Sequence, residues 1–486
     1  MMRSLFSGVS GLKVHQAKMD VIGNNIANVN TIGFKSSTVN FSDVLYQTTQ
    51  SASGPNAVTG ATGRNAMQIG LGAGVASITA SMTTSGASER TDNPFDIMIE
   101  GDSFFVVNNG GANYFTKAGA FNIDAAGTLC TAEGASVMGW QVDPNDATKA
   151  VADAVSPLKI MSAENLYAEP EATTDVNLTG NIDSMDTQLT SATGKVVNFS
   201  FFDKMGHSYT ADLKITQSTD NTNTYDVAVT DIKDENGQSI FVTKNPPDAT
   251  TGLVTYTNSA INTFTFGGVT YTVGSVNEDG SFALDTADPC KLVFDPATGA
   301  FTGVSQDGTT TDKSLTLSLG GSTTDNTSPF SDIAIDFSSL TMYSTAGKST
   351  VESSKGSLTG LGAGKKVGNM TGVSIDSSGK IYGKYDNGDS KLLGQIAVAS
   401  FANPAGLEAI GNSMFSATQN SGEFDGIGHD VSSSGGKMST GVLEMSNVDL
   451  SQQFTDMITT QRGFQANSRF ITTSDTLLEE LINLKR

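Results

Sequence analysis

Residues 450–482 read LSQQFTDMITTQRGFQANSRFITTSDTLLEELI, a segment in which apolar residues recur with the period of an α-helix. Positions spaced four and three apart form one stripe along it, interrupted by a few polar residues. The stripe consists of Leu450, Phe454, Met457, Gln461, Phe464, Ser468, Ile471, Asp475, Leu478 and Ile482. It predicts a C-terminal helix of about 36 residues, about 54 Å long at 1.5 Å per residue.

A second stripe of the same spacing lies at the opposite end of the chain and predicts a helix of about 26 residues. It consists of Leu5, Val9, Leu12, Gln16, Met19, Gly23 and Ile26. Gly8, Gly11 and Gly23 lie inside this helix, and each costs about 1 kcal/mol relative to alanine. A short helix weakened in this way needs a partner. We expect the two terminal helices to pair with each other; the alternative is two ordinary amphipathic helices packed on a globular core.

The region between the two ends is predicted to consist of short β-strands. Alternating apolar residues mark strands at 95–99 and 104–107, and again at 196–202, 211–215, 225–229, 264–266 and 291–294. Segments rich in Asp, Asn and Gly separate them, for example at 124–127 and 234–237. These segments match neither the EF-hand loop nor the calcium-binding nonapeptide repeat, so we interpret them as hairpin turns.

The order of these patterns predicts a nested chain. The fold class is mainly β with terminal α-helices, in which paired, coiled-coil-like helices enclose nested β-sandwich or barrel domains. The predicted parts are a helical assembly domain (1–35 with 441–486), an extended connector and hinge (36–75 with 431–440), a split inner β domain (76–145 with 367–430) and one or more inserted outer β domains (146–366).

Charge is distributed unevenly along the 486 residues, whose net charge is −22. Residues 1–35 carry +3 and residues 440–486 carry −2, so −23 lies between them. Nearly neutral ends can pack densely across many copies, while an acidic middle keeps an assembly in solution. A chain this acidic has no general basic field for nucleic acid, which we exclude as a partner.

No pattern predicts a catalytic, cofactor-binding or metal site. The three histidines, His15, His207 and His429, are far apart, and the two cysteines, Cys130 and Cys290, suit neither a disulfide framework nor a metal cluster. Phosphate-binding and nucleophile-elbow motifs are missing. No apolar run approaches the length of a membrane span, and the N-terminus has no secretion signal.

One carboxylate pair, Asp183 with Asp186, has a spacing that could serve acid–base chemistry. Among 50 acidic residues such pairs arise by chance. A secreted enzyme acting on peptidoglycan, carried on these chain ends, is therefore an alternative that needs a conspicuous site within 146–366, and none is apparent.

Segments at both ends resemble those of the bacterial flagellar rod and hook proteins. Residues 25–35 (NIANVNTIGFK) resemble the N-terminal signature of that family, and residues 441–450 (GVLEMSNVDL) and 457–466 (MITTQRGFQA) resemble the C-terminal one. The matching signature residues are Asn28, Asn30, Thr31, Gly33, Phe34, Lys35, Glu444, Ser446, Asn447, Val448, Asp449, Gln461 and Arg462. Residues 95–107, 114–121, 393–401 and 403–407 resemble the family's middle β domain, with Lys117, where relatives often have arginine, expected at an exposed turn.

The long insertion resembles hook members of the family more than the shorter rod members, because residues 197–206 (VNFSFFDKMG) are similar to the hook outer domain. The resemblance implies a structural subunit of the hook, which polymerises into a flexible helical tube and transmits torque from rod to filament as a universal joint. The alternative is a distal rod or hook–filament junction component of the same family.

The resemblance also implies partners and a location. The partners are further copies in a helical homopolymer, the distal rod protein, the hook cap protein, the hook–filament junction protein and the flagellar type III export apparatus. The location is extracellular, in the hook and basal body of the flagellum, reached without a cleaved signal peptide. The residues expected to pack subunits are Leu5, Val9, Leu12, Met19, Ile26, Leu450, Phe454, Met457, Phe464, Ile471, Leu478 and Ile482.

Overall fold

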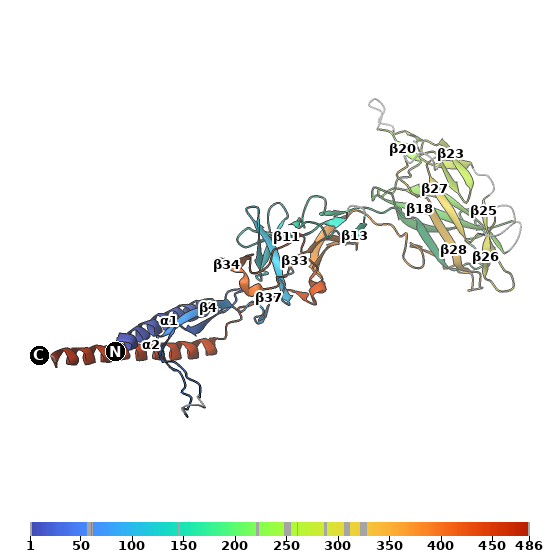
Figure 1. Cartoon of the computed structure of the whole chain (residues 1–486). Coiled ribbons are helices and arrows are strands. Elements are labelled where there is room, and N and C mark those ends of the chain that lie inside the picture. Colours follow the sequence, from blue (N-terminus) through green and yellow to red (C-terminus); the bar gives the residue numbers. More distant parts are fainter. Residues whose placement is uncertain are drawn as a thin grey trace. The chain divides into compact units, whose positions relative to one another are not determined.

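The computed structural model divides the chain into two compact units (Figure 1). Unit 1 comprises Met1–Leu166, Thr371–Lys384 and Ser390–Arg486, and unit 2 comprises Tyr167–Met370 and Tyr385–Asp389. The structure describes residues 2–55, 60, 62–143, 146–219, 223–246, 254–259, 261–285, 289–305, 312–320 and 328–484.

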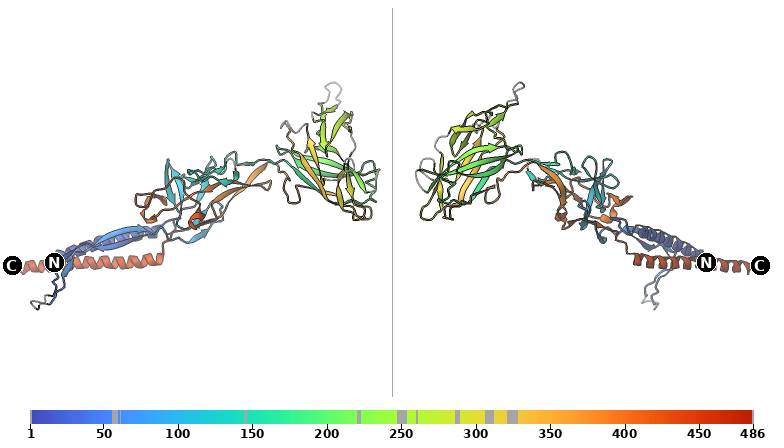
Figure 2. Two further views of the ribbon diagram at one scale, coloured as in Figure 1. Left: turned by 45° about the vertical axis from the view of Figure 1, so that its right-hand side comes forward. Right: turned by 180° about the vertical axis from the view of Figure 1, so that it is seen from behind.

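Both predicted terminal helices are confirmed. Helix α1 spans Met2–Ala27 and helix α2 spans Leu450–Asn483, and the two pack against each other in unit 1 (Figures 1 and 2). The carboxylate of Asp449 caps α2 by accepting hydrogen bonds from the backbone N–H groups of Ser451 and Gln452. No described helix has the length and apolar character that crossing a membrane requires.

Residues 36–75 differ from the expected extended connector, because they form paired strands. Strand β1 (Ser37–Asp43) pairs antiparallel with β4 (Ala73–Ala80), and β2 (Tyr46–Gln50) pairs with β3 (Met67–Gly70). We call these four strands, together with Val44 and Leu45 between β1 and β2, the arm. Apolar residues such as Val39 and Ile78 lie opposite each other in the ladder, and such cross-strand pairs stabilise the sheet. The high Ser, Thr and Gly content of this segment made these strands difficult to predict from the sequence.

The second expected connector, 431–440, is also ordered. A short 3-10 helix η2 (Val431–Ser434) ends at Gly435, whose φ of 74° suits glycine. Strand β36 (Lys437–Thr440) then pairs with β6 (Ile97–Glu100). Whether either segment acts as a hinge stays a prediction, but neither is an unpaired tether.

The β part of unit 1 is assembled from both halves of the sequence. Its remaining elements are β5 (Ser88–Arg90), β7 (Phe104–Asn109), β8 (Ala112–Thr116), β9 (Phe121–Ile123), β10 (Leu129–Thr131), β11 (Ser136–Trp140), β12 (Val142–Asp143), β13 (Asp146–Ala150), β14 (Ser156–Pro157), β31 (Lys380–Tyr385), β32 (Ser390–Ile396), β33 (Val398–Ala399), η1 (Pro404–Gly406), β34 (Glu408–Gly411), β35 (Met414–Ser416) and β37 (Val442–Glu444). The order β32-β11-β7-β8-β35-β34 interleaves the halves. Phe104, Phe115, Phe401 and Phe415 meet in its core.

Unit 2 contains two sheets that share one apolar core. Its elements are β15 (Tyr167–Ala168), β16 (Asp175–Asn181), β17 (Lys195–Phe202), β18 (Ser208–Gln217), β19 (Thr224–Lys233), β20 (Val242–Lys244), β21 (Tyr256–Asn258), β22 (Thr263–Phe266), β23 (Val269–Val276), β24 (Phe282–Asp285), β25 (Cys290–Phe294), β26 (Phe301–Ser305), β27 (Ser314–Leu319), β28 (Ile333–Thr341), β29 (Glu352–Lys355) and β30 (Gly368–Ile375), which leads out of the unit. One sheet has the order β24-β23-β22-β27-β28-β16-β29 and the other β17-β18-β19-β25-β26. Alternate residues of both sheets face the core, which is the packing of a β-sandwich.

Several predictions for this unit are confirmed. The expected strands at 196–202, 211–215, 225–229, 264–266 and 291–294 lie within β17, β18, β19, β22 and β25. The segment 234–237 is a hairpin turn, in which Asp234 Oδ1 accepts hydrogen bonds from the backbone N–H groups of Asn236 and Gln238. Cys290, in unit 2, and Cys130, in unit 1, are both free thiols.

Candidate assembly site

The contact between the terminal helices is built on small residues. A Cβ atom added to Gly11 would lie 2.6 Å from Nδ2 of Asn467, and one added to Gly8 would lie 3.2 Å from Cγ1 of Ile471. The glycines that weaken α1 as an isolated helix therefore bring its backbone close to α2. By contrast, Gly23 has no atom within 4 Å of an added Cβ.

The remaining contacts continue along the same face of α1. The His15 ring packs on Gly463, where an added Cβ would lie 2.7 Å from ring atoms. Lys18 forms an ion pair with Asp456 at 3.2 Å, and Asn25 Nδ2 donates to Gln453 Oε1 at 3.2 Å. Because later residues of α1 meet earlier residues of α2, the two helices run antiparallel.

The predicted packing stripes are only partly covered in this structure, although Ile471 of the α2 stripe contacts Gly8. Half-buried positions are Leu5, Leu12, Met19, Ile26, Met457, Phe464, Ile471 and Leu478, and exposed positions are Val9, Leu450, Phe454 and Ile482. The fully buried apolar residues of α1 are Val14 and Ile22, which the stripe omitted. The role of the stripe in packing between subunits stays a prediction.

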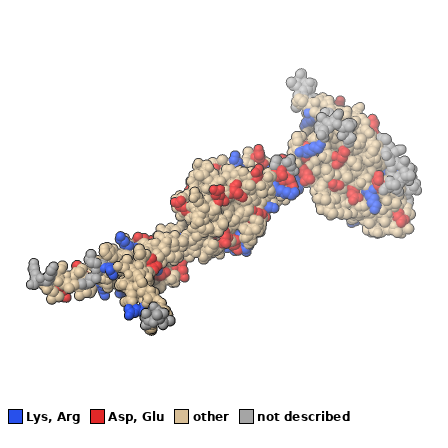
Figure 3. Space-filling view, in the orientation of Figure 1, with Lys and Arg blue, Asp and Glu red and all other residues tan. Residues whose placement is uncertain are grey.

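The arm lies against α1 and leaves many apolar side chains exposed. The backbone N–H of Ala73 donates to Ser10 Oγ at 3.3 Å, and the rings of His15 and Phe41 meet edge to face with centroids 6.1 Å apart. The exposed apolar residues of the arm are Phe41, Val44, Leu45, Tyr46, Met67, Ile69, Val75 and Ile78. On the face shown in Figure 3, the helix pair and the arm are largely uncharged.

Helix α2 and its C-cap residue Leu484 also expose apolar side chains, half of them near the C-terminal end. Leu477, Leu481 and Leu484 are 48%, 49% and 82% exposed, as expected for residues off the main stripe. Phe454, Ile458, Phe470 and Ile482 are exposed too. Apolar surface of this extent marks an interaction site in a soluble protein.

A buried ion pair joins the segments that follow α1 and precede α2. Lys35 Nζ and Glu444 Oε1 are 2.7 Å apart, and their side chains are 2% and 1% exposed. Lys35 Nζ also donates to the carbonyl oxygen of Thr84 at 2.8 Å, and Glu444 Oε1 accepts from the backbone N–H of Gly86 at 2.9 Å. Such charges are tolerated in an interior only when they are paired and hydrogen-bonded. We call Gly33, Lys35, Thr84, Gly86, Glu444 and Asn447 the junction.

Side-chain amides complete the backbone hydrogen bonding around the junction. Asn447 Oδ1 accepts from the backbone N–H of Ser36 at 2.7 Å, and its Nδ2 donates to the carbonyl oxygens of Ser81 and Thr84 at 3.0 and 3.1 Å. Asn25 bonds both backbone groups of Ser37 in the same way, at 2.8 and 2.9 Å. These side-chain amides form the hydrogen bonds with backbone groups that a neighbouring β-strand would otherwise form.

Glycine is required at the junction for close approach. The backbone N–H of Gly33 donates to the carbonyl oxygen of Glu444 at 2.8 Å, its φ is 67°, and an added Cβ would lie 2.6 Å from the backbone nitrogen of Ala118. A Cβ at Gly86 would overlap the carbonyl oxygen of Met445. The turn therefore anchors the end of α1 directly on the β part of unit 1.

The structure brings some signature residues to the junction and leaves others outside it. Gly33, Lys35, Glu444 and Asn447 belong to it, and Asp449 caps α2. Asn28 accepts from the Thr31 hydroxyl in the turn after α1, and Ser446 Oγ accepts from the backbone N–H of Val448. Phe34 is half-buried, whereas Asn30, Gln461 and Arg462 are exposed and make no junction contact.

The expectation that Lys117 lies at an exposed turn is wrong. Its side chain is fully buried, its Nζ donates to the carbonyl oxygen of Gly101 at 2.5 Å, and Nζ lies 5.1 Å from the centre of the Phe104 ring. Burial lowers the pKa of the Lys117 ammonium to about 8, with Glu444 acting to raise it and Lys35 to lower it. The Lys-Ala-Gly sequence indicated a turn, but the carbonyl and the ring give its ammonium a partner inside.

Replacing Lys117 with methionine should change how stability depends on pH. A lysine titrates near pH 10.4 in the unfolded chain and near 8 in the folded one, so between these values the unfolded chain binds more protons. Stability contributed by this group therefore rises with pH through that window, by up to about 3 kcal/mol. We expect urea unfolding at pH 7 to 10 to show this rise in the parent and its loss in Lys117→Met. An exposed-lysine control, Lys437→Met, should keep the rise, and parallel profiles for the parent and Lys117→Met would contradict the assignment.

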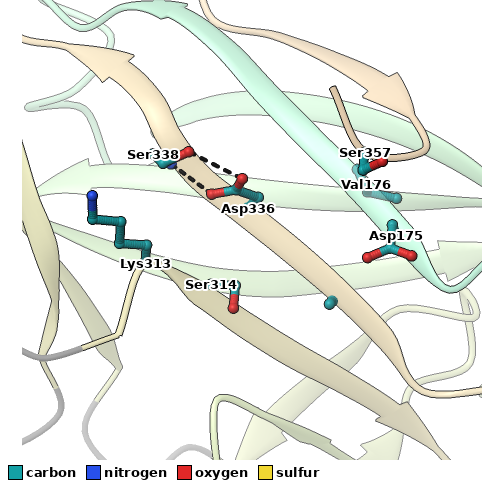
Figure 4. Close-up of a pocket in the computed structure, with 8 residues that line it drawn as sticks. Asp175, Val176, Lys313, Ser314, Asp336, Ser338 and Ser357 are labelled. Carbon is teal, nitrogen blue, oxygen red and sulfur yellow. Dashed lines mark hydrogen bonds between the residues drawn. The ribbon is translucent and has the colours of Figure 1, made fainter. Parts of the chain in front are cut away.

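Two hollows of the described surface are lined by polar side chains that are largely engaged with one another or with the backbone. In unit 1, a hollow of about 500 Å³ lies between the end of α1 and the β34–β35 hairpin and is lined by Asn24, Asn28 and Asn412 among others. In unit 2, a hollow of about 260 Å³ is lined by Asp175, Lys313 and Asp336 among others, which Figure 4 draws as sticks. Both carboxylates are engaged, Asp175 by the Thr174 hydroxyl and Asp336 by the backbone and hydroxyl of Ser338. Within the described ranges, no three His, Cys, Asp or Glu side chains gather to hold a metal ion.

The carboxylate pair Asp183 and Asp186 is buried as part of the backbone framework. Asp183 accepts from the backbone N–H groups of Met185, Thr345 and Gly347, and these bonds, led by that of Met185, hold its pKa below the ordinary value. Asp186 accepts from the backbone N–H of Ser349 at 3.0 Å. A general acid needs a raised pKa, so this geometry favours a structural role for Asp183.

Comparison with known proteins identifies the family of these chain ends. Residues 5–35 match the family described as flagella basal body rod protein, residues 98–167 match the flagellar hook protein FlgE/F/G D1 domain, and residues 439–484 match the flagellar basal body rod FlgEFG protein C-terminal family.

Full-length relatives extend the similarity to the whole chain. The flagellar hook protein FlgE of Treponema pallidum is 35% identical over 505 residues, and that of Borreliella burgdorferi is 34% identical over 500 residues, each with 100% of both chains covered. A crystal structure of Helicobacter pylori flagellar hook protein FlgE2 is similar over 72% of this chain and 98% of that chain, at 15% identity and a TM-score of 0.33. The full-length identity shows that the chain belongs to the flagellar hook protein FlgE family and is a structural subunit of the bacterial flagellar hook.

Proposed function

We propose that copies of this chain polymerise into a flexible helical tube that transmits torque from the rod to the filament. The observation that carries the proposal is the apolar surface that the monomer leaves uncovered on α1, α2 and the arm. Phe6 of α1 is 67% exposed, Leu484 of α2 is 82% exposed and Leu45 of the arm is 62% exposed. Burying one such side chain contributes about 1.5–3 kcal/mol, so neighbouring copies gain substantially by covering them.

The charge distribution supports the same arrangement. The nearly neutral ends, +3 and −2, form the helix pair, and the acidic residues lie mainly between them. Because the ends are nearly neutral, the helices of many copies pack densely in an inner wall without strong charge repulsion. Outer β domains with polar, acidic surfaces exchange neighbours easily when the tube bends, because exposed ion pairs contribute only about 0–1 kcal/mol each.

Further elements of the proposal rest on the family. Residues 1–35 with 441–486 form the assembly domain, 36–75 with 431–440 the connector, 76–145 with 367–430 the inner β domain and 146–366 the outer β region. The tube joins the distal rod protein to the hook–filament junction protein and grows beneath the hook cap protein. The subunit reaches this extracellular position through the flagellar type III export apparatus.

Polymerisation can be tested with leucines that the monomer does not bury. The triple variant Leu477→Ser, Leu481→Ser, Leu484→Ser should remain a stable monomer but fail to form tubes, because the burial that neighbours supply is lost. Sedimentation and negative-stain electron microscopy of the purified proteins provide the measurement. The control is Leu358→Ser, Leu361→Ser in unit 2, where the leucines are 71% and 72% exposed. Tubes of normal yield from the triple variant would refute the proposed packing.

A further inference from the structure

The junction connects two points that are remote along the chain and adjacent to both helices. Lys35 and Glu444 are 409 residues apart in sequence; Lys35 follows α1 and Glu444 precedes α2. Lys35 lies eight residues after the end of α1 and Glu444 six residues before the start of α2, so their ion pair limits how far the bases of the two helices can separate. Neither residue belongs to a helix, so the pair does not depend on α1 and α2 being formed.

The junction is anchored in the β part of unit 1. Glu444 lies at the end of β37, opposite Ser88 of β5, and Thr84 and Gly86 precede β5. Gly33 packs against the backbone of Ala118, beside the buried Lys117. These contacts are with strands and loops and not with α1 or α2, and such contacts do not require the helices to be formed.

The ion pair also has only one favourable arrangement. Glu444 Oε2 is buried and accepts no hydrogen bond from any described residue, so this carboxylate is hydrogen-bonded through Oε1, by Lys35 and the Gly86 N–H. The buried ammonium of Lys117 adds an electrostatic attraction. An apolar pair would tolerate small shifts, whereas a buried charge that loses its partner is strongly destabilising. The pair therefore specifies a single position for the two chain segments.

We propose that the Lys35–Glu444 ion pair is a latch that holds the bases of both terminal helices together in the monomer, before assembly. The inference rests on the proposed polymerisation and adds to it a positioning device. With the bases fixed, α1 and α2 fold onto a neighbouring copy as one unit. With the latch open, assembly must also bring the N-terminal and C-terminal segments together, and this costs additional chain entropy.

The test uses two latch variants and a matched control. Lys35→Met leaves Glu444 without its counter-ion, whereas the double variant Lys35→Met, Glu444→Gln removes both charges and keeps an oxygen for the Gly86 N–H. The control, Lys18→Met, Asp456→Asn, removes an ion pair that joins α1 to α2 and is about one-quarter to one-third exposed. All variants are made in the full chain.

Two measurements distinguish a latch from an ordinary structural contact. Hydrogen exchange of the monomer reports on the backbone N–H groups of Gly33 and Gly86, which donate to Glu444. We expect protection of both in the parent, at least roughly a tenfold loss in the double variant, and no change in β7. The critical concentration for tube formation should rise at least roughly tenfold in the double variant and change by less than about threefold in the control.

Two results would contradict the latch. Rapid exchange of Gly33 and Gly86 in the parent monomer, or normal polymerisation of a double variant that has lost their protection, would overturn the latch. If Lys35→Met alone unfolds, the double variant still carries the test, and unfolding of both would show a requirement for folding instead of a positioning device. Failure of the parent to form tubes would count against the proposed function, while amide protection would still report whether the latch is closed.

Discussion

Replacing Gly11 with leucine should abolish tube formation, whereas the same replacement at Gly23 should not. At Gly11 even a Cβ atom would lie 2.6 Å from Nδ2 of Asn467, so a leucine forces α1 away from α2. Overpacking of this kind costs about 1–3 kcal/mol in one molecule. In a tube, the same misfit recurs in every copy.

Gly23 is the matched control, because it lies in the same helix with no atom within 4 Å of an added Cβ. Its replacement by leucine or alanine should favour α1, since an interior glycine costs about 1 kcal/mol relative to alanine. Electron microscopy of the assembled protein and the critical concentration for tube formation measure the two effects. Adding Asn467→Ala to Gly11→Leu should restore some tubes. Equal tube yield from both leucine variants would show that the close helix contact is not used in assembly.

The glycine contact also shows what periodicity alone does not reveal. The stripe of Leu5, Val9 and Leu12 correctly predicted a helix, because apolar residues at this spacing define one of its faces. The face that meets α2 contains Gly8, Gly11 and His15, at the same spacing but shifted around the helix. Hydrophobic periodicity counts apolar side chains and ignores glycine. From the sequence, Gly8 and Gly11 therefore appear only as residues that weaken the helix, although they lie on the face that approaches α2 closely.

Strands were predicted where the pattern is local and missed where pairing depends on distant residues. The alternation in β17 and β19 is visible in a few residues, since one side of each strand faces the core of unit 2. In the arm, β1 pairs with β4 across an intervening hairpin, and its exposed apolar side chains are diluted by Ser and Thr. Composition therefore indicated a connector, and the ladder became apparent only in three dimensions.

The junction lies beyond the reach of a single sequence for a similar reason. Lys35 and Glu444 were recognised as signature residues by resemblance, but nothing in either segment indicates that they form a pair across 409 positions. Lys117 was misjudged because a lysine beside Ala and Gly is usually exposed. Its burial depends on Gly101 and Phe104, which become its neighbours only when the sheet forms.

Deleting residues 1–30 together with 445–486 should leave a soluble, folded β core that cannot polymerise. The deletion removes both helices but retains Lys35 and Glu444, so the core still closes at the junction. It also removes Asn447, whose Nδ2 donates to Ser81 and Thr84, and the loop must then rely on Lys35 and Glu444 alone. We expect the truncated chain to melt within a few degrees of the parent and to form no tubes at any concentration.

We expect both ends of the chain to be unfolded in the isolated monomer and to fold on assembly. Helix α1 contains three interior glycines and is too short to be stable without partners. Helix α2 leaves Leu477, Leu481 and Leu484 about half exposed or more, and only neighbouring copies can cover them. Hydrogen exchange of the full-length monomer should therefore show unprotected ends and a protected region within 95–430. Because burial of a few leucines at about 1.5–3 kcal/mol each must offset the entropy of ordering both ends, protection of α1 and α2 should appear only in tubes. Strong protection of either helix in a verified monomer would mean that the α1–α2 contact is sufficient by itself, and that assembly joins helices already formed.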